Sequence, residues 1–113
     1  MPIRIIFMPQ AEETYFYLRD NAYSKIERTL LRAIDQKLEI IKINPRYGNP
    51  IAKILIPKEY EHKYEATNLF RVELPNFWRM LYTVKNEEIE IIAFILDIVN
   101  HKEYNKKFGY KKN

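Results

Sequence analysis

A chain of 113 residues, of which 47% are hydrophobic and 30% charged, provides enough apolar material for one core and too little length for two domains. It contains no cysteine, which excludes disulfides, thiolate metal sites and cysteine nucleophiles. The chain has 19 basic and 15 acidic groups, a net charge of +4. Five of the lysines and one glutamate lie in residues 101–113, whereas residues 1–100 hold 14 groups of each sign. All of the net positive charge therefore lies in the last thirteen residues. We therefore predict a single domain, 1–113, with a basic C-terminal tail, 101–113.

The expected location is the cytoplasm, without a membrane partner. The longest apolar run, Ile91 to Leu96, is far shorter than the ~20 residues that a membrane-spanning helix needs. The first residues do not show the pattern of a signal peptide. The two histidines, His62 and His101, are distant in the sequence, so we expect no metal site and no cofactor.

The first half of the chain predicts a strand and two helices. Ile3 to Met8 has the composition of a short strand, which Pro9 is expected to close. Gln10 to Asn21 is expected to form a helix with acidic residues in its first turn, where the helix dipole favours them.

The second helix has the clearest pattern. Ser24 and Glu27 have the spacing of a capping box at its start, and Pro45 ends it near Ile43. Apolar residues recur at three- and four-residue spacing and predict one packed face: Ile26, Leu30, Ile34, Leu38 and Ile41. Only two or three residues separate the helices, which therefore should form an antiparallel hairpin.

The second half predicts a sheet. Asn44 to Pro50 is rich in turn residues, and a short apolar stretch, Ile51 to Ile56, precedes a polar segment with room for a helical turn, Pro57 to Thr67. Three strands follow, with a tight turn at Pro75 and Asn76: Leu69 to Leu74, Trp78 to Lys85 and Glu88 to Val99. The last is continuously apolar, as in a strand buried on both faces. The expected fold class is α+β, in which an N-terminal strand and an antiparallel two-helix hairpin precede a three-strand antiparallel meander, with the helices on one face of the sheet.

This order of elements resembles the RelE/ParE toxin superfamily. The segment Asn68 to Val84, NLFRVELPNFWRMLYTV, is similar to the family's pattern of an aromatic and a basic residue on one strand, a turn, and then aromatic–Arg–apolar–apolar–Tyr. The segment Ile95 to Tyr104, ILDIVNHKEY, looks like the family's last strand and its basic, tyrosine-bearing end. The run His101 to Tyr110 looks most like archaeal members.

The resemblance implies one of two activities. RelE-like toxins cleave mRNA in the A site of the ribosome, on the small subunit, whereas ParE-like toxins inhibit DNA gyrase. In both branches an antitoxin protein wraps the toxin with an extended segment. A homodimer through the helical hairpin or the apolar strands remains an alternative use of those surfaces.

RNA cleavage by attack of the 2′-hydroxyl needs a base, cations that stabilise the charged phosphorane, and an acid. By resemblance, the candidate catalytic residues are Arg79, from the aromatic–Arg motif, together with Arg71, His101 and Tyr104. Each has a plainer alternative. Either arginine would suit an ion pair across the hairpin, His101 a helix cap or an exposed position, and Tyr110 is a rival for the role of Tyr104.

The candidate RNA-binding residues lie mostly in the basic tail, where aromatic side chains alternate with lysines: Lys53, Lys102, Lys106, Lys107 and Tyr110. The alternative is a solvated, frayed terminus.

Glu73 departs from the pattern of catalytic members of the family, which often have a second basic residue at that position, two after Arg71. An acid there would repel a phosphate.

The sequence leaves three hypotheses for the function. They are a ribosome-dependent mRNA endonuclease toxin that contacts mRNA and rRNA, a RelE-like factor that docks on the ribosome without cleaving, and a ParE-like gyrase inhibitor.

Overall fold

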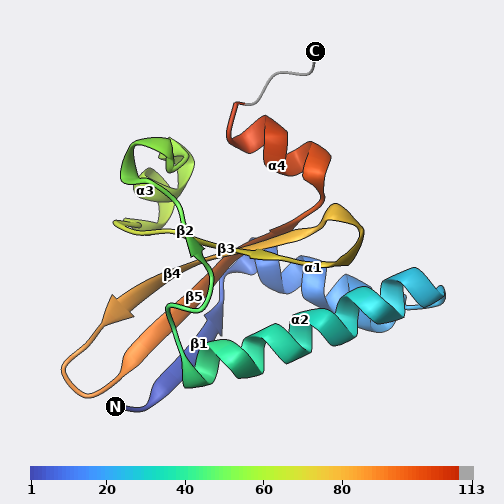
Figure 1. Cartoon of the computed structure of the whole chain (residues 1–113), viewed down its shortest axis with the longest axis horizontal. Helices are drawn as coiled ribbons and strands as arrows, with labels where there is room; N and C mark the ends of the chain where they lie inside the picture. The colour runs from blue at the N-terminus through green and yellow to red at the C-terminus, as the bar shows by residue number, and fades with distance from the viewer. Residues whose placement is uncertain (110–113) are drawn as a thin grey trace.

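The structure is a computed structural model, and it describes residues 1–109. Its elements are β1 (Ile3–Phe7), α1 (Pro9–Asp20), α2 (Lys25–Ile43), β2 (Asn49–Pro50), the 3-10 helix η1 (Lys53–Leu55), α3 (Lys58–Tyr64), β3 (Phe70–Glu73), the 3-10 turn η2 (Pro75–Phe77), β4 (Arg79–Asn86), β5 (Ile91–Val99) and α4 (His101–Lys107). Figure 1 shows a central sheet with α1 and α2 on one side and α3 and α4 on the other.

The five strands form one sheet in the order β1-β5-β4-β3-β2. The predicted meander is confirmed, because β3, β4 and β5 pair antiparallel in succession. β1 pairs parallel with β5, so β5 has a neighbour on each side, and seven of its nine residues are buried. The expectation of a strand buried on both faces is confirmed, although the strand begins at Ile91 rather than at Glu88.

The predicted helical hairpin covers one face of the sheet. The capping box at Ser24 and Glu27 is present, and four members of the apolar stripe are buried, namely Leu30, Ile34, Leu38 and Ile41. Ile26 is exposed because the first turn of α2 projects past the sheet (Figure 1). Pro9 does not merely close β1: it is the first residue of α1, a position that needs no backbone N–H donor.

The start of the predicted basic tail is a helix. Asn100 and Glu103 form a second capping box, and α4 follows it from His101 to Lys107. The alternative of a frayed terminus is therefore wrong for these residues. Tyr104 of α4 is buried against the sheet and stacks on Phe108, with 4.3 Å between the ring centroids.

A second apolar cluster lies on the face opposite the hairpin, beneath α3 and α4. Its buried members are Ile56, Tyr60, Ala66, Leu69, Leu81, Leu96, Val99 and Tyr104. Because side chains alternate along a strand, Phe70 and Val72 of β3 face the α1–α2 hairpin, and Arg71 and Glu73 lie on the side of α4. Among the described residues, no helix is long and apolar enough to cross a bilayer.

Candidate functional site

Arg71 of β3 and Arg79 of β4 meet at one carboxylate. The antiparallel register places Glu73 opposite Arg79 and Arg71 opposite Leu81, so the three charged side chains share a face. The Nε of Arg71 lies 2.9 Å from Oε1 of Glu73, and the Nε of Arg79 lies 3.4 Å from Oε2. The ion pair across the hairpin is therefore present between Arg79 and Glu73, and Glu73 also pairs with Arg71 along its own strand.

Tyr104 lies beneath the two guanidinium groups. Its side chain is only 2% exposed, and the Cζ of Arg79 is 4.5 Å from the centre of its ring. The Nη1 of Arg71 donates to the Tyr104 hydroxyl oxygen at 3.0 Å. Three of the four predicted catalytic residues are thus brought together. We call Arg71, Glu73, Arg79 and Tyr104 the arginine–tyrosine cluster.

His101 lies at the rim of this cluster. It is the first residue of α4, its side chain is exposed, and its ring lies 6.0 Å from the ring of Phe77. Phe77 is joined to the cluster in turn, because its carbonyl oxygen accepts from Nη1 of Arg79 at 3.3 Å. Sequence reasoning did not single out Phe77; the available signal was an aromatic residue directly after the predicted turn.

The candidate RNA-binding lysines divide into two groups. Lys53, Lys102 and Lys106 are exposed. Lys107 points inward, with its Nζ 3.0 Å from Oε1 of Glu59 and 3.3 Å from Oδ2 of Asp97. Its charge is therefore engaged within the protein. Tyr110 lies outside the described residues.

Two hollows flank Arg71 at the edge of the sheet. The larger, of about 270 Å³, is lined by Lys37, Tyr47, Gly48, Asn49, Arg71, Val72 and Glu73. The smaller, of about 150 Å³, is lined by Asn49, Pro50, Ile51, Ala52, Leu55, Arg71 and Tyr104. A ligand that reaches Arg71 therefore has room on either side of it. Within residues 1–109, no group of three or more His, Asp or Glu side chains is placed to hold a metal ion.

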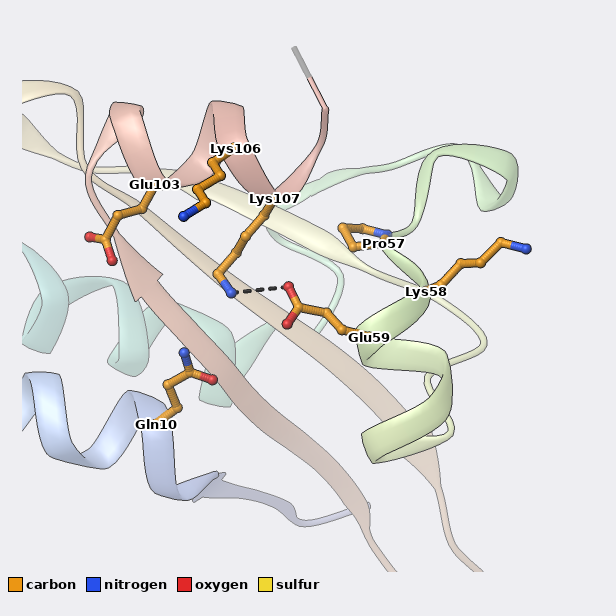
Figure 2. Close-up of a pocket in the computed structure, with 7 residues that line it drawn as sticks. All are labelled: Gln10, Pro57, Lys58, Glu59, Glu103, Lys106 and Lys107. Carbon is orange, nitrogen blue, oxygen red and sulfur yellow. Dashed lines mark hydrogen bonds and ion pairs between the residues drawn. The ribbon is translucent and has the colours of Figure 1, made fainter. Parts of the chain in front are cut away.

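A third and larger hollow, of about 520 Å³, lies between the starts of α1 and α3 and the side of α4 (Figure 2). It is lined by Gln10, Pro57, Lys58, Glu59, Glu103, Lys106 and Lys107. Figure 2 shows Lys107 and Glu59 pointing toward each other across it. Its charges have both signs, so it has no marked preference for an anion or a cation.

A buried polar network behind this hollow fastens α3 and α4 to the sheet. Asp97 of β5 is 1% exposed, and its Oδ2 accepts from the Tyr60 hydroxyl at 2.7 Å. Burial raises the pKa of Asp97 above its usual range, although its bonds to Tyr60 and Lys107 oppose this. Burial alone would lower the pKa of Lys107, but the hydrogen bond to Glu59 and the nearby carboxylates raise it overall. The network therefore holds α4, and with it Tyr104, in place.

We expect the protein to lose stability in alkali, through this network and through the Tyr15–Asp35 hydrogen bond of the helical hairpin. Burial and the Asp97 carboxylate raise the pKa of Tyr60 well above 10.0, its ordinary value, and the hydrogen bond to Asp35 raises the pKa of Tyr15 to about 12. A raised folded-state pKa stabilises the fold below the unfolded pKa, and this contribution is lost as pH rises. Above about pH 10 the free energy of unfolding should therefore fall, by up to about 1.4 kcal/mol per pH unit from Tyr60 and by less from Tyr15, whose interaction with Asp35 is screened by solvent.

Urea denaturation between pH 8 and pH 11 measures this slope. The Tyr60→Phe variant should be less stable at pH 8, since it loses the bond to Asp97, but should show a shallower fall in alkali. Equal slopes for the two proteins would contradict the assignment.

Comparison with known proteins identifies the fold. No family model matches the sequence, and no curated protein does. Among solved structures, the fold is similar to a YoeB/ParE toxin from Agrobacterium tumefaciens, with a TM-score of 0.58 and 13% identity over 87% of this chain and 98% of that one. It is also similar to a mutant of the E. coli toxin RelE in the free state, with a TM-score of 0.56 and 14% identity over 97% of this chain and 94% of that one. The chain has a RelE/ParE-like toxin fold, as the sequence motifs predicted.

Proposed function

We propose that this chain, with its RelE-like fold, is the toxin of a toxin–antitoxin pair and inhibits translation by cleaving mRNA in the A site of the ribosome. An antitoxin protein is the partner that would neutralise it. The observation that carries the proposal is the arginine–tyrosine cluster, in which two guanidinium groups from adjacent strands lie over one tyrosine. The cluster is on the same side of the sheet as α4, whose Lys102 and Lys106 are exposed (Figure 1).

Each component of the reaction has a candidate group in this site. The guanidinium groups of Arg71 and Arg79 suit the scissile phosphate, since a planar guanidinium donates two parallel hydrogen bonds to phosphate oxygens. Glu73 is exposed between them and is a candidate base for the 2′-hydroxyl proton. The 2′-oxygen then bonds to phosphorus, the bond to the 5′-oxygen breaks, and His101 is the candidate donor of the proton that this oxygen takes. The products are a 2′,3′-cyclic phosphate and a 5′-hydroxyl.

The assignment gives Tyr104 a positioning role. Because its side chain is buried and its hydroxyl accepts from Arg71, it fixes the guanidinium groups and does not reach the RNA itself. Exposed Lys53, Lys102 and Lys106 are the candidate contacts to RNA phosphates outside the reaction centre.

The proposal is tested with translating ribosomes. Purified protein is added, and the 5′ ends of the mRNA are mapped by primer extension. New ends at the codon in the A site are expected. Intact mRNA at stoichiometric protein would reject cleavage, and loss of supercoiling by purified DNA gyrase under the same conditions would favour the ParE-like activity.

One observation favours a second function, in which the protein binds the ribosome without cleaving mRNA. Glu73 already pairs with both arginines and offsets part of their charge, so a phosphate has to compete with it. In that case, the protein would co-sediment with ribosomes while the mRNA remains intact.

The Glu73→Gln variant tests which role Glu73 has. If Glu73 is the base, the substitution should lower the single-turnover cleavage rate by about 10²- to 10⁴-fold, the usual contribution of general base catalysis. The affinity for ribosomes should remain the same or increase, because the negative charge that competes with the phosphate has been removed. A variant that cleaves at the wild-type rate would show that Glu73 is not the base; Glu39→Gln, at an exposed ion pair on α2, is the matched control.

A further inference from the structure

Phe77 is a large apolar side chain without an evident structural role. It lies at the end of η2, in the connection between β3 and β4, and is 71% exposed. Its backbone and that of Asn76 adopt left-handed conformations, with φ of 62° and 59°. A bulky side chain is unfavourable in this region, which suits asparagine or glycine. The connection therefore holds an aromatic ring in solvent at a conformational cost.

The position of the ring relates it to the arginine–tyrosine cluster. The Phe77 carbonyl oxygen accepts from Nη1 of Arg79 at 3.3 Å, so ring and guanidinium are held by the same short segment. On the other side, the rings of Phe77 and His101 meet at 66° with 6.0 Å between centroids. Figure 1 shows the start of α4 beside the β3–β4 connection, in agreement with this contact. An edge-to-face pair restricts how either ring turns.

We infer that Phe77, supported by His101, is a stacking platform for a nucleobase of single-stranded RNA, next to a phosphate bound by Arg79. The inference rests on the proposed function and names a subsite within it. A guanidinium and an exposed ring in neighbouring positions match the charge and the flat apolar face of one nucleotide. Because every base has such a face, the platform should accept all four bases with modest preferences.

Stacking contributes a measurable part of RNA affinity. Removing one aromatic platform should weaken binding by roughly 5- to 150-fold, which corresponds to about 1–3 kcal/mol per base. The probe is a single-stranded RNA decamer that contains 2-aminopurine, whose fluorescence is quenched when it stacks. Affinity and quenching are measured at low salt for wild-type protein, Phe77→Ala, Phe77→Asn, Phe77→Trp and Arg79→Ala.

The variants are chosen so that folding does not decide the result. Phe77→Asn removes the ring but favours the left-handed backbone, so it should fold at least as well as the wild type. Ile89→Ala is the control for loss of an exposed apolar side chain, since Ile89 is 79% exposed and follows the far end of β4.

Phe77→Ala and Phe77→Asn should lose both quenching and affinity, Phe77→Trp should keep them, and Ile89→Ala should match the wild type. If Arg79→Ala weakens binding while both Phe77 variants bind and quench normally, the stacking platform is wrong and the proposed function stands. If neither Arg79→Ala nor the Phe77 variants change binding, the proposed site itself is wrong, and the platform with it.

Discussion

Replacing Arg79 with alanine should lower the rate of mRNA cleavage on the ribosome by about 10²- to 10³-fold, the usual effect of removing one preorganised donor to a transition-state charge. Arg79 lies over the ring of Tyr104 and beside Glu73, so its guanidinium is held in position before any phosphate arrives. Single-turnover cleavage at saturating protein measures the loss. Arg79→Lys should recover only part of the rate, because an ammonium keeps the charge without the planar pair of donors.

The chain offers a closely matched control. Arg19 of α1 also pairs with a carboxylate, at 3.2 Å from Asp20, and its Cζ also lies over an aromatic ring, at 4.4 Å from the centre of Phe16. Arg19→Ala should cleave at the wild-type rate. Wild-type cleavage by a folded Arg79→Ala variant would contradict the assigned role of the cluster.

Replacing Asp97 with alanine should have the largest effect on stability. The substitution leaves the Tyr60 hydroxyl without its acceptor. It also removes one of the two carboxylates that pair with Lys107, a side chain that is mostly buried. Breaking a buried ion pair typically costs 3–5 kcal/mol, and since Glu59 still pairs with Lys107 we expect about 3 kcal/mol. Urea denaturation at pH 7 measures it.

The surface carboxylate Asp35 is the control for this substitution. It also accepts from a tyrosine hydroxyl, at 2.6 Å from Tyr15, but its side chain is exposed. Asp35→Ala should therefore cost about 1 kcal/mol, close to the net value of an ordinary hydrogen bond. Adding Lys107→Met to Asp97→Ala should restore part of the lost stability. A cost below about 1 kcal/mol for Asp97→Ala would show that the network does not hold α4.

The elements with strong local signals were predictable. A capping box and an apolar stripe identified α2, and period-two alternation identified the hairpin of β3 and β4. The pairing of β1 with β5 was not predictable, because β1 lies more than eighty residues before its partner and no local pattern reports a parallel register. The helix α4 was not predicted, although Asn100 and Glu103 have the same spacing as Ser24 and Glu27. The density of lysines was interpreted either as an RNA-binding surface or as a frayed terminus.

Within the site, the motif placed Arg71, Arg79 and Tyr104 in one group, and the structure brings them together. The motif did not reveal that Glu73 joins both arginines, because the strand register places only Arg79 opposite Glu73. Nor did it reveal that Lys107 turns inward. Its partners, Glu59 and Asp97, come from other elements and are brought to it only by the fold.

The most direct measurement is a cryo-EM structure of the Glu73→Gln variant bound to a ribosome whose mRNA carries a 2′-O-methyl group in the A site, so that cleavage is blocked. We predict that the guanidinium groups of Arg71 and Arg79 lie about 3 Å from oxygens of one mRNA phosphate. A complex in which the opposite face of the sheet, covered by α1 and α2, meets the mRNA while the arginine–tyrosine cluster faces solvent would contradict the proposed mode of action.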